Sequence, residues 1–263
     1  MRKNAANRKP QVLPVVIFAL CAGVGIAAIV AVVLEKSKPT PRVDPPALSS
    51  SPPSQSSPAP GNTDALDFSK LPEDPAQLVN LGSEMLQRGY VTQATRIYLE
   101  ALKKNPEDEE VHFNLGFAYA RQHLTNEAIQ HYQESLRIFP DYAEAHNNLG
   151  NLLVGQKKYD EAIEHFSAAL KTSPEDSSAL NNLGRALMSQ GKTNEAIQRF
   201  EEAVRVNTNY IEAHFNLGNA YLASGKEELA EAQYGEVLRI SPQSEPAVQA
   251  ARTRIRILRQ ARP

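Results

Sequence analysis

The sequence lacks the residues that most often carry covalent or metal chemistry. Its 263 residues include one cysteine, Cys21, which lies in an apolar run. A single cysteine excludes a disulfide framework and a metal site built from several thiolates. The sequence also contains no glycine-rich dinucleotide motif, no phosphate-binding GKS/T loop, no HExxH zinc motif and no nucleophile elbow. We therefore expect neither enzymatic activity nor a bound cofactor or metal ion.

Basic residues are scarce in the body of the chain. Residues 64–251 contain 16 Lys and Arg against 28 Asp and Glu, whereas residues 1–63 contain seven basic residues and two acidic ones. Binding to nucleic acid requires a basic surface that neutralises phosphates. The acidic body therefore argues against nucleic acid as a partner.

The N-terminus resembles a membrane anchor. Residues 1–11 form a basic tail, and residues 12–34 contain no charged side chain. A helix of this length spans roughly 35 Å, which is enough to cross the ~30 Å hydrocarbon core of a bilayer. A cleaved signal peptide is the alternative, although its apolar region is usually only about 7–15 residues long. We predict a single transmembrane helix over residues 12–34.

The charges that flank this segment favour a cytoplasmic N-terminus only mildly, because basic residues lie on both sides of it. The following domain would then face outward, into the periplasm if the source is bacterial, and a cytosol-facing domain stays open. Small residues recur every fourth position of the segment, at Ala19, Gly23, Ala27 and Ala31. Such a stripe allows self-association of the anchor, or it reflects the usual composition of membrane helices.

Residues 35–74 are predicted to form a linker and a lead-in segment. Residues 37–63 contain eight prolines and seven serines. This composition provides too little apolar surface for a core, so we expect a disordered, semi-extended spacer. Its reach is up to roughly 80 Å, which would hold the following domain away from the bilayer.

The remainder of the chain repeats every 34 residues. Prolines 106, 140, 174 and 242 are separated by 34 residues or by twice that number. Counting from them defines five repeats: 75–108, 109–142, 143–176, 177–210 and 211–244. One helix pair cannot bury its own apolar face, so repeats of this kind stack on one another.

Four positions in the repeat are nearly constant. Position 7 is leucine, position 8 glycine and position 20 alanine in all five repeats, and position 24 is always aromatic (Tyr98, Tyr132, Phe166, Phe200 and Tyr234). Positions 4, 8 and 11 share one face of a helix. The small residues allow the two helices of a pair to approach closely, and we expect the aromatic ring to fill the space between neighbouring pairs.

This pattern resembles the tetratricopeptide repeat (TPR). The resemblance implies an all-α, right-handed superhelical solenoid of five helix-turn-helix repeats, in which the first helices line a concave surface. The segments AHNNLG and LNNLG are similar to repeats that precede the catalytic domain of O-linked N-acetylglucosamine transferase. Only about twenty residues follow the repeats here, and residues 245–263 are predicted to form a capping helix with an Arg-rich tail.

Asparagine at position 6 is the candidate functional feature. It occurs in every repeat, as Asn80, Asn114, Asn148, Asn182 and Asn216. This position lies about 200° around the helix from position 4, so we expect it to point away from the core and into the concave groove. A carboxamide offers donors and an acceptor that match a peptide group. The asparagines therefore predict a ladder that binds the backbone of an extended peptide or protein segment.

Nearby positions extend this candidate site. Positions 9 and 13 contribute Arg121, Asn151, Arg185 and Asn219 to the same stripe. The alternative is that asparagine at position 6 is inherited from the repeat consensus and serves folding or solubility. The histidines at position 4 (His112, His146 and His214) are interpreted as packing residues, because ligands 34 residues apart make a poor metal site.

The predicted function is therefore a membrane-anchored scaffold that binds a protein or peptide. Two other functions stay open at this stage. One is a structural tether or assembly factor of an envelope complex, acting through the convex face or self-association. The other is a chaperone for exported polypeptides. The Arg-rich tail is either a contact for an acidic partner or lipid headgroups, or a solvated helix end.

Overall fold

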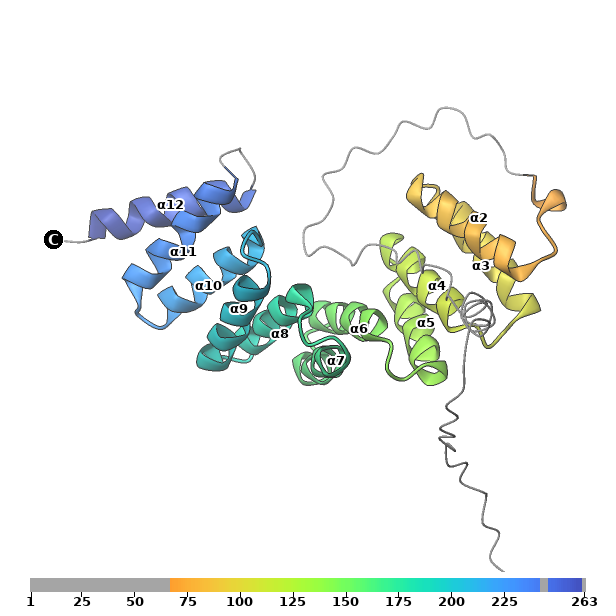
Figure 1. Ribbon diagram of the computed structural model, residues 1–263, viewed down its shortest axis with the longest axis horizontal. Coiled ribbons are helices and arrows are strands. Elements are labelled where there is room, and N and C mark those ends of the chain that lie inside the picture. The colour runs from red at the N-terminus through yellow and green to blue at the C-terminus, as the bar shows by residue number, and fades with distance from the viewer. Residues whose placement is uncertain (1–66, 242–245, 262–263) are drawn as a thin grey trace, which may run out of the picture. The chain divides into compact units, whose positions relative to one another are not determined.

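The computed structural model describes residues 67–241 and 246–261, and the part described contains α-helices but no strand. Each predicted repeat holds one pair of helices, here called helix A and helix B (Figure 1). The pairs are α2 (Pro75–Gln87) and α3 (Val91–Lys104), α4 (Glu109–Arg121) and α5 (Thr125–Ile138), α6 (Ala143–Gly155) and α7 (Tyr159–Thr172), α8 (Ser177–Ser189) and α9 (Thr193–Val206), and α10 (Ile211–Ala223) and α11 (Glu227–Ile240).

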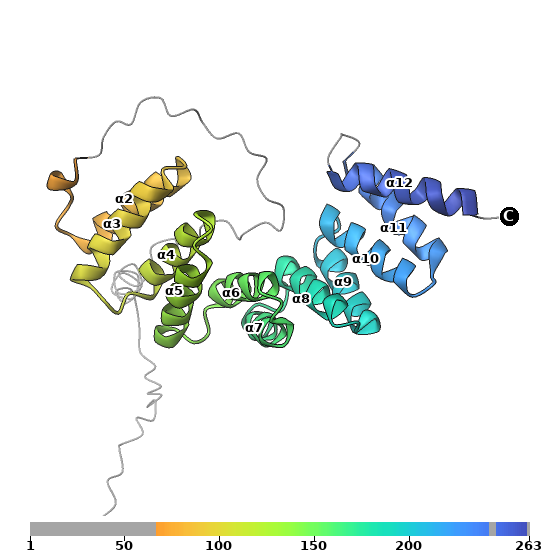
Figure 2. The ribbon, with the colours of Figure 1, turned by 180° about the vertical axis from the view of Figure 1, so that it is seen from behind.

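The pairs stack in chain order. Each helix packs against its neighbours in the sequence, and helix A of one pair also contacts helix A of the next at α2–α4, α6–α8 and α8–α10. Opposite views in Figures 1 and 2 show the same succession of pairs. The described part of the chain is therefore an all-α solenoid, as the 34-residue period predicts.

Within each pair, an aromatic ring of helix B lies directly against a glycine of helix A. A Cβ atom added at the glycine would lie only 2.5–2.7 Å from the nearest ring carbon. The five pairs are Gly82–Tyr98, Gly116–Tyr132, Gly150–Phe166, Gly184–Phe200 and Gly218–Tyr234. All five aromatic side chains are at most 1% exposed. The ring therefore fills space inside its own pair, and not only between neighbouring pairs as predicted.

The turn from helix A to helix B has the same backbone conformation in every repeat. Position 15 adopts a positive φ of 61–83° in all five, and it is glycine in three repeats but His123 and Lys157 in the others. Three residues after the end of helix A, a backbone N–H donates to the carbonyl five residues earlier, as Lys158 does to Leu153 at 2.9 Å. This is the Schellman bond that satisfies the last carbonyls of a helix. The shared turn gives every pair the same geometry.

Two further helices cover the ends of the stack. The 3-10 helix η1 (Phe68–Lys70) precedes the first pair, and Phe68 and Leu71 pack against its core. At the other end, α12 (Pro246–Ala261) contacts α10 and α11 and buries an apolar stripe of Val248, Ala251, Ile255 and Leu258. A helix is therefore present where the capping helix is predicted.

The predicted anchor at residues 12–34, its small-residue stripe and the linker up to residue 66 lie outside the described residues. Among the helices within residues 67–241 and 246–261, none combines the length and the apolar character needed to cross a membrane.

Candidate functional site

The asparagines at position 6 differ in their exposure. Asn114, Asn148 and Asn182 are only 1–2% exposed, whereas Asn216 is half-buried and Asn80 is exposed. The prediction that position 6 points away from the core is therefore wrong for the three central repeats. Stacked A helices meet along this side, so the side chain at position 6 enters the seam between two repeats.

Within this seam, asparagines of successive repeats bond to one another. The amide nitrogen of Asn182 donates to the side-chain oxygen of Asn147 at 3.1 Å, and Asn216 donates in the same way to Asn181 at 2.9 Å. Each bond joins position 6 of one repeat to position 5 of the preceding one. We call these two contacts the asparagine bridges. They satisfy buried polar groups and place carboxamides from three consecutive A helices in one row.

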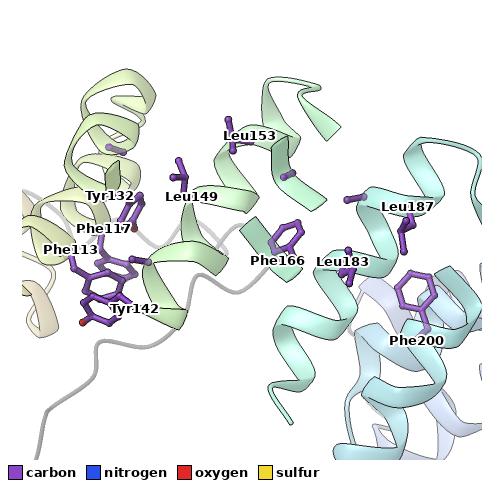
Figure 3. Packing of buried hydrophobic residues seen from close by; sticks show 14 of the residues in the cluster. Phe113, Phe117, Tyr132, Tyr142, Leu149, Leu153, Phe166, Leu183, Leu187 and Phe200 are labelled. Carbon is purple, nitrogen blue, oxygen red and sulfur yellow. The ribbon is translucent and has the colours of Figure 1, made fainter. Parts of the chain in front are cut away.

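The junction between the second and third repeats lacks such a bridge. Position 5 of the second repeat is Phe113, which has no acceptor for Asn148. Both polar atoms of the Asn148 side chain are buried and have no hydrogen-bond partner. Figure 3 shows the aromatic residues Phe113, Phe117, Tyr132 and Tyr142 gathered at this junction. Asn148 therefore makes no hydrogen bond of good geometry, and the hydroxyl of Tyr132 is a polar group close to it.

The hydroxyl of Tyr132 at this junction is likewise buried without a partner. In the first repeat, the equivalent Tyr98 hydroxyl lies 3.1 Å from the Ser83 hydroxyl at position 9. Position 9 of the second repeat is Phe117, which offers no such group. Burial raises the pKa of Tyr132 well above its ordinary value, and the nearby Asn148 carboxamide partly opposes that rise. The two unpartnered groups are therefore close neighbours.

The other predicted site residues lie at different depths. Arg121 is exposed and Asn151 is half-buried. Arg185 donates to the side-chain oxygen of Asn182 at 3.4 Å, and Asn219 accepts a bond of 2.9 Å from the hydroxyl of Tyr234. The structure therefore joins Arg185 to the asparagine row and leaves Arg121 at the surface.

Sequence reasoning missed the partners in the bridges, Asn147 and Asn181. Their signal was present as the doublets Asn147–Asn148 and Asn181–Asn182, of which only the second member was considered. It also missed His131 and His165 at position 23, which lie against the position-4 histidines of their own repeats. Across the part of the chain that the structure describes, no three His, Cys, Asp or Glu residues form a group able to hold a metal ion.

The fold and this polar row define a scaffold of stacked helix pairs. Four family profiles match it: one described as TPR repeat covers residues 82–122 and 184–225, and three described as tetratricopeptide repeat cover 107–175, 153–199 and 211–244. Together the matches run without a gap from residue 82 to residue 244. The chain belongs to the tetratricopeptide-repeat family.

Solved structures of other TPR proteins share the fold. MamA from Desulfovibrio magneticus RS-1 is 21% identical with a TM-score of 0.61, and the match covers 66% of this chain and 98% of that one. PilF from Pseudomonas aeruginosa is 23% identical with a TM-score of 0.61, covering 70% and 88%. YrrB, described as a TPR protein with an unusual peptide-binding site, is 20% identical with a TM-score of 0.57, covering 68% and 92%. Comparison with curated proteins found no significant match.

Proposed function

We propose that this protein is a non-catalytic scaffold that binds an extended peptide segment of a partner protein along its A helices. The observation that carries the proposal is the pair of asparagine bridges, at 3.1 and 2.9 Å. They support a row of carboxamides along the A helices of the third, fourth and fifth repeats. Stacked helices roughly 8–10 Å apart would offer one carboxamide level to about every third residue of an extended chain.

In this proposal the asparagines have two roles. Asn182 and Asn216 hold neighbouring A helices in register through the asparagine bridges, while the more accessible members, the exposed Asn80 and the half-buried Asn216, would contact the ligand. Asn148 is buried as well, at 1% exposed, but its side chain lacks a hydrogen-bond partner, so it would contact the ligand once the seam beside it opens. A buried polar group without a partner costs about 1–3 kcal/mol, so bonding to a peptide group would relieve that cost.

Side chains beside the row would complete the contact. Arg121, Asn151, Arg185 and Asn219 provide donors and acceptors but little apolar surface. Such a wall favours recognition of the peptide backbone over particular side chains. The right-handed twist implied by the family would wrap these groups around the ligand.

The N-terminal segment would determine where this binding takes place. A membrane helix at residues 12–34 followed by the Pro/Ser-rich linker would tether the repeats to a bilayer at a distance of up to roughly 80 Å. We propose that the partner is presented at or near the same membrane, with the repeats outside the cytoplasm.

Photo-crosslinking from Asn151 tests this proposal. A photoreactive residue at position 151, in the full chain in cells, is expected to capture one extended segment of a partner, identified by mass spectrometry. The same residue at Gln130, which is exposed on helix B of the second repeat, is the matched control and should capture nothing comparable. Equal capture from both positions would contradict binding along the A helices.

A second candidate function, a structural tether that acts through the B helices, is favoured by one observation. A groove of about 400 Å³ is lined by Ile163, Ser167 and Leu170 of α7, Leu183 and Leu187 of α8, and Arg199 of α9, among others. Its lining combines aliphatic side chains with the charged residues Lys171, Glu195 and Arg199. Crosslinks from the exposed Ser167, together with none from Asn151, would favour this function over peptide binding.

A further inference from the structure

Two pairs of histidines occupy equivalent positions in the second and third repeats. The Nδ1 atoms of His112 and His131 are 3.0 Å apart, and those of His146 and His165 are 2.8 Å apart. In each pair the first histidine is on helix A at position 4 and the second is on helix B at position 23. We call these contacts the histidine pairs.

The helix A histidine also reaches the turn that precedes its own repeat. Nε2 of His112 lies 3.1 Å from the carbonyl oxygen of Pro106, and Nε2 of His146 lies 2.9 Å from that of Pro140. Each histidine pair therefore connects three elements: the turn between repeats, helix A and helix B.

These contacts determine where the protons lie. A carbonyl oxygen only accepts, so Nε2 of His112 must carry a proton. In a neutral ring Nδ1 is then the acceptor, and His131 donates to it from its own Nδ1. One added proton, either on Nε2 of His131 or on Nδ1 of His112 with a change of tautomer in His131, still leaves one donor and one acceptor between the paired Nδ1 atoms. A second added proton leaves two N–H groups and two positive charges facing each other.

We propose that the two histidine pairs form an acid-sensitive latch that fixes the second and third repeats at neutral pH and releases them on acidification. Release would loosen α4 to α7, the segment that contains Asn114, Asn148 and Asn151. The latch rests on contacts within the repeats and does not depend on the proposed peptide binding.

The surroundings of the pairs set the direction of the pH effect. His131 is faced by His112 and by the ring of Tyr119, which stacks on it at 5.4 Å, while Glu134 lies on its own helix and is held by Arg137. Burial, and then the charge of His112, lowers the pKa of His131 to about 4, and Glu134 opposes this. Burial and then His146 also lower the pKa of His165, against Glu161.

A histidine with a lowered folded-state pKa binds fewer protons in the folded state than in the unfolded chain. Its contribution to stability is therefore complete above the unfolded pKa of about 6.5 and is lost as the pH falls toward 4. For both pairs the vulnerable range lies below about pH 6.5.

The fifth repeat provides a natural counterpart that has no second imidazole. His214 occupies position 4, and its Nε2 lies 3.2 Å from the carbonyl oxygen of Thr208, while its Nδ1 lies 2.7 Å from Oε1 of Gln233 in place of the second imidazole. Turning the Gln233 carboxamide over puts its NH2 group there, which donates to Nδ1 of a neutral ring. Glutamine at position 23 is thus compatible with the same geometry, so His131→Gln combined with His165→Gln should preserve the bonds without the second titrating group.

Hydrogen exchange of the full chain tests the latch. Between pH 7.5 and 5.0, after correction for the intrinsic exchange rates, protection of α4–α7 in the wild type is expected to fall about tenfold more than that of α10–α11. In the H131Q/H165Q variant the excess loss should disappear. The same excess loss in both proteins, or no excess loss in the wild type, would overturn the proposal.

A measurement on the wild type alone guards against a variant that fails to fold. Imidazole ¹⁵N resonances at pH 7.5 should show the Nε2–H tautomer for His112 and His146 and the Nδ1–H tautomer for His131 and His165. The Nε2–H tautomer in all four rings would overturn the latch, because no proton would then lie between the paired nitrogens.

Discussion

Gly150→Val is expected to lower the free energy of unfolding by about 3 kcal/mol, the cost typical of severe overpacking in a core. A Cβ atom at this position would lie 2.7 Å from the ring of Phe166, which is completely buried. The ring cannot turn aside without displacing its own neighbours, so helices α6 and α7 must separate. Urea denaturation monitored by circular dichroism measures the change.

Gly155, in the same helix, is the matched control. A Cβ atom added at Gly155 would have no other atom within 4 Å, apart from its chain neighbours and the nearby backbone of its own helix. Gly155→Ala should therefore stabilise the protein by about 0.5–1 kcal/mol through helix propensity. A second substitution, Phe166→Leu, in the Gly150→Val protein should recover part of the lost stability, because the smaller side chain leaves space for the valine. A Gly150→Val protein as stable as the wild type would contradict the proposed packing inside each pair.

Asn182→Leu is expected to destabilise the protein and Asn148→Leu is not, although both residues occupy position 6. Asn182→Leu removes a buried donor and leaves the oxygen of Asn147 unpartnered, at a cost of about 2–3 kcal/mol. Asn148→Leu removes a carboxamide that has no partner, so stability should stay equal or rise by about 1 kcal/mol. Because both variants carry the same substitution, the difference between their stabilities measures the contribution of the asparagine bridge.

Thermal or urea unfolding of the two variants in parallel measures this difference. A matching loss of stability in both would show that Asn148 has a bonded partner in the folded protein. If Asn148 serves peptide binding, its leucine variant should also bind the crosslinked partner segment more weakly while remaining fully folded.

Much of the fold follows from the 34-residue period, because the period places the same helix starts, turns and small residues in each repeat. Helix A begins at the first residue of every predicted repeat, from Pro75 to Ile211. The close approach of helices A and B at position 8 can also be predicted from the sequence, since glycine there and an aromatic residue at position 24 recur together. These features are local to one helix pair.

The candidate site was harder to predict because it lies between repeats. Rotation by 100° per residue places Asn182 on one side of an isolated helix, but it does not say that the next helix pair covers that side. The partner of Asn182 is 35 residues away, and the pattern breaks where Phe113 replaces asparagine. The pairing of His112 with His131 likewise depends on how helices A and B are packed. Contacts of this kind can be identified only in the three-dimensional structure.

Recognition of a peptide backbone by the asparagine row is the central claim, and the segment captured from Asn151 allows a direct test. The measurement compares the affinity of that segment with two sets of variants, one N-methylated at single backbone amides and one with single alanine substitutions. N-methylation at the contact positions should weaken binding about tenfold, the value of one hydrogen bond of roughly 1.4 kcal/mol, while alanine changes should alter it less than about twofold. Strong losses on alanine substitution with no effect of N-methylation would contradict the claim.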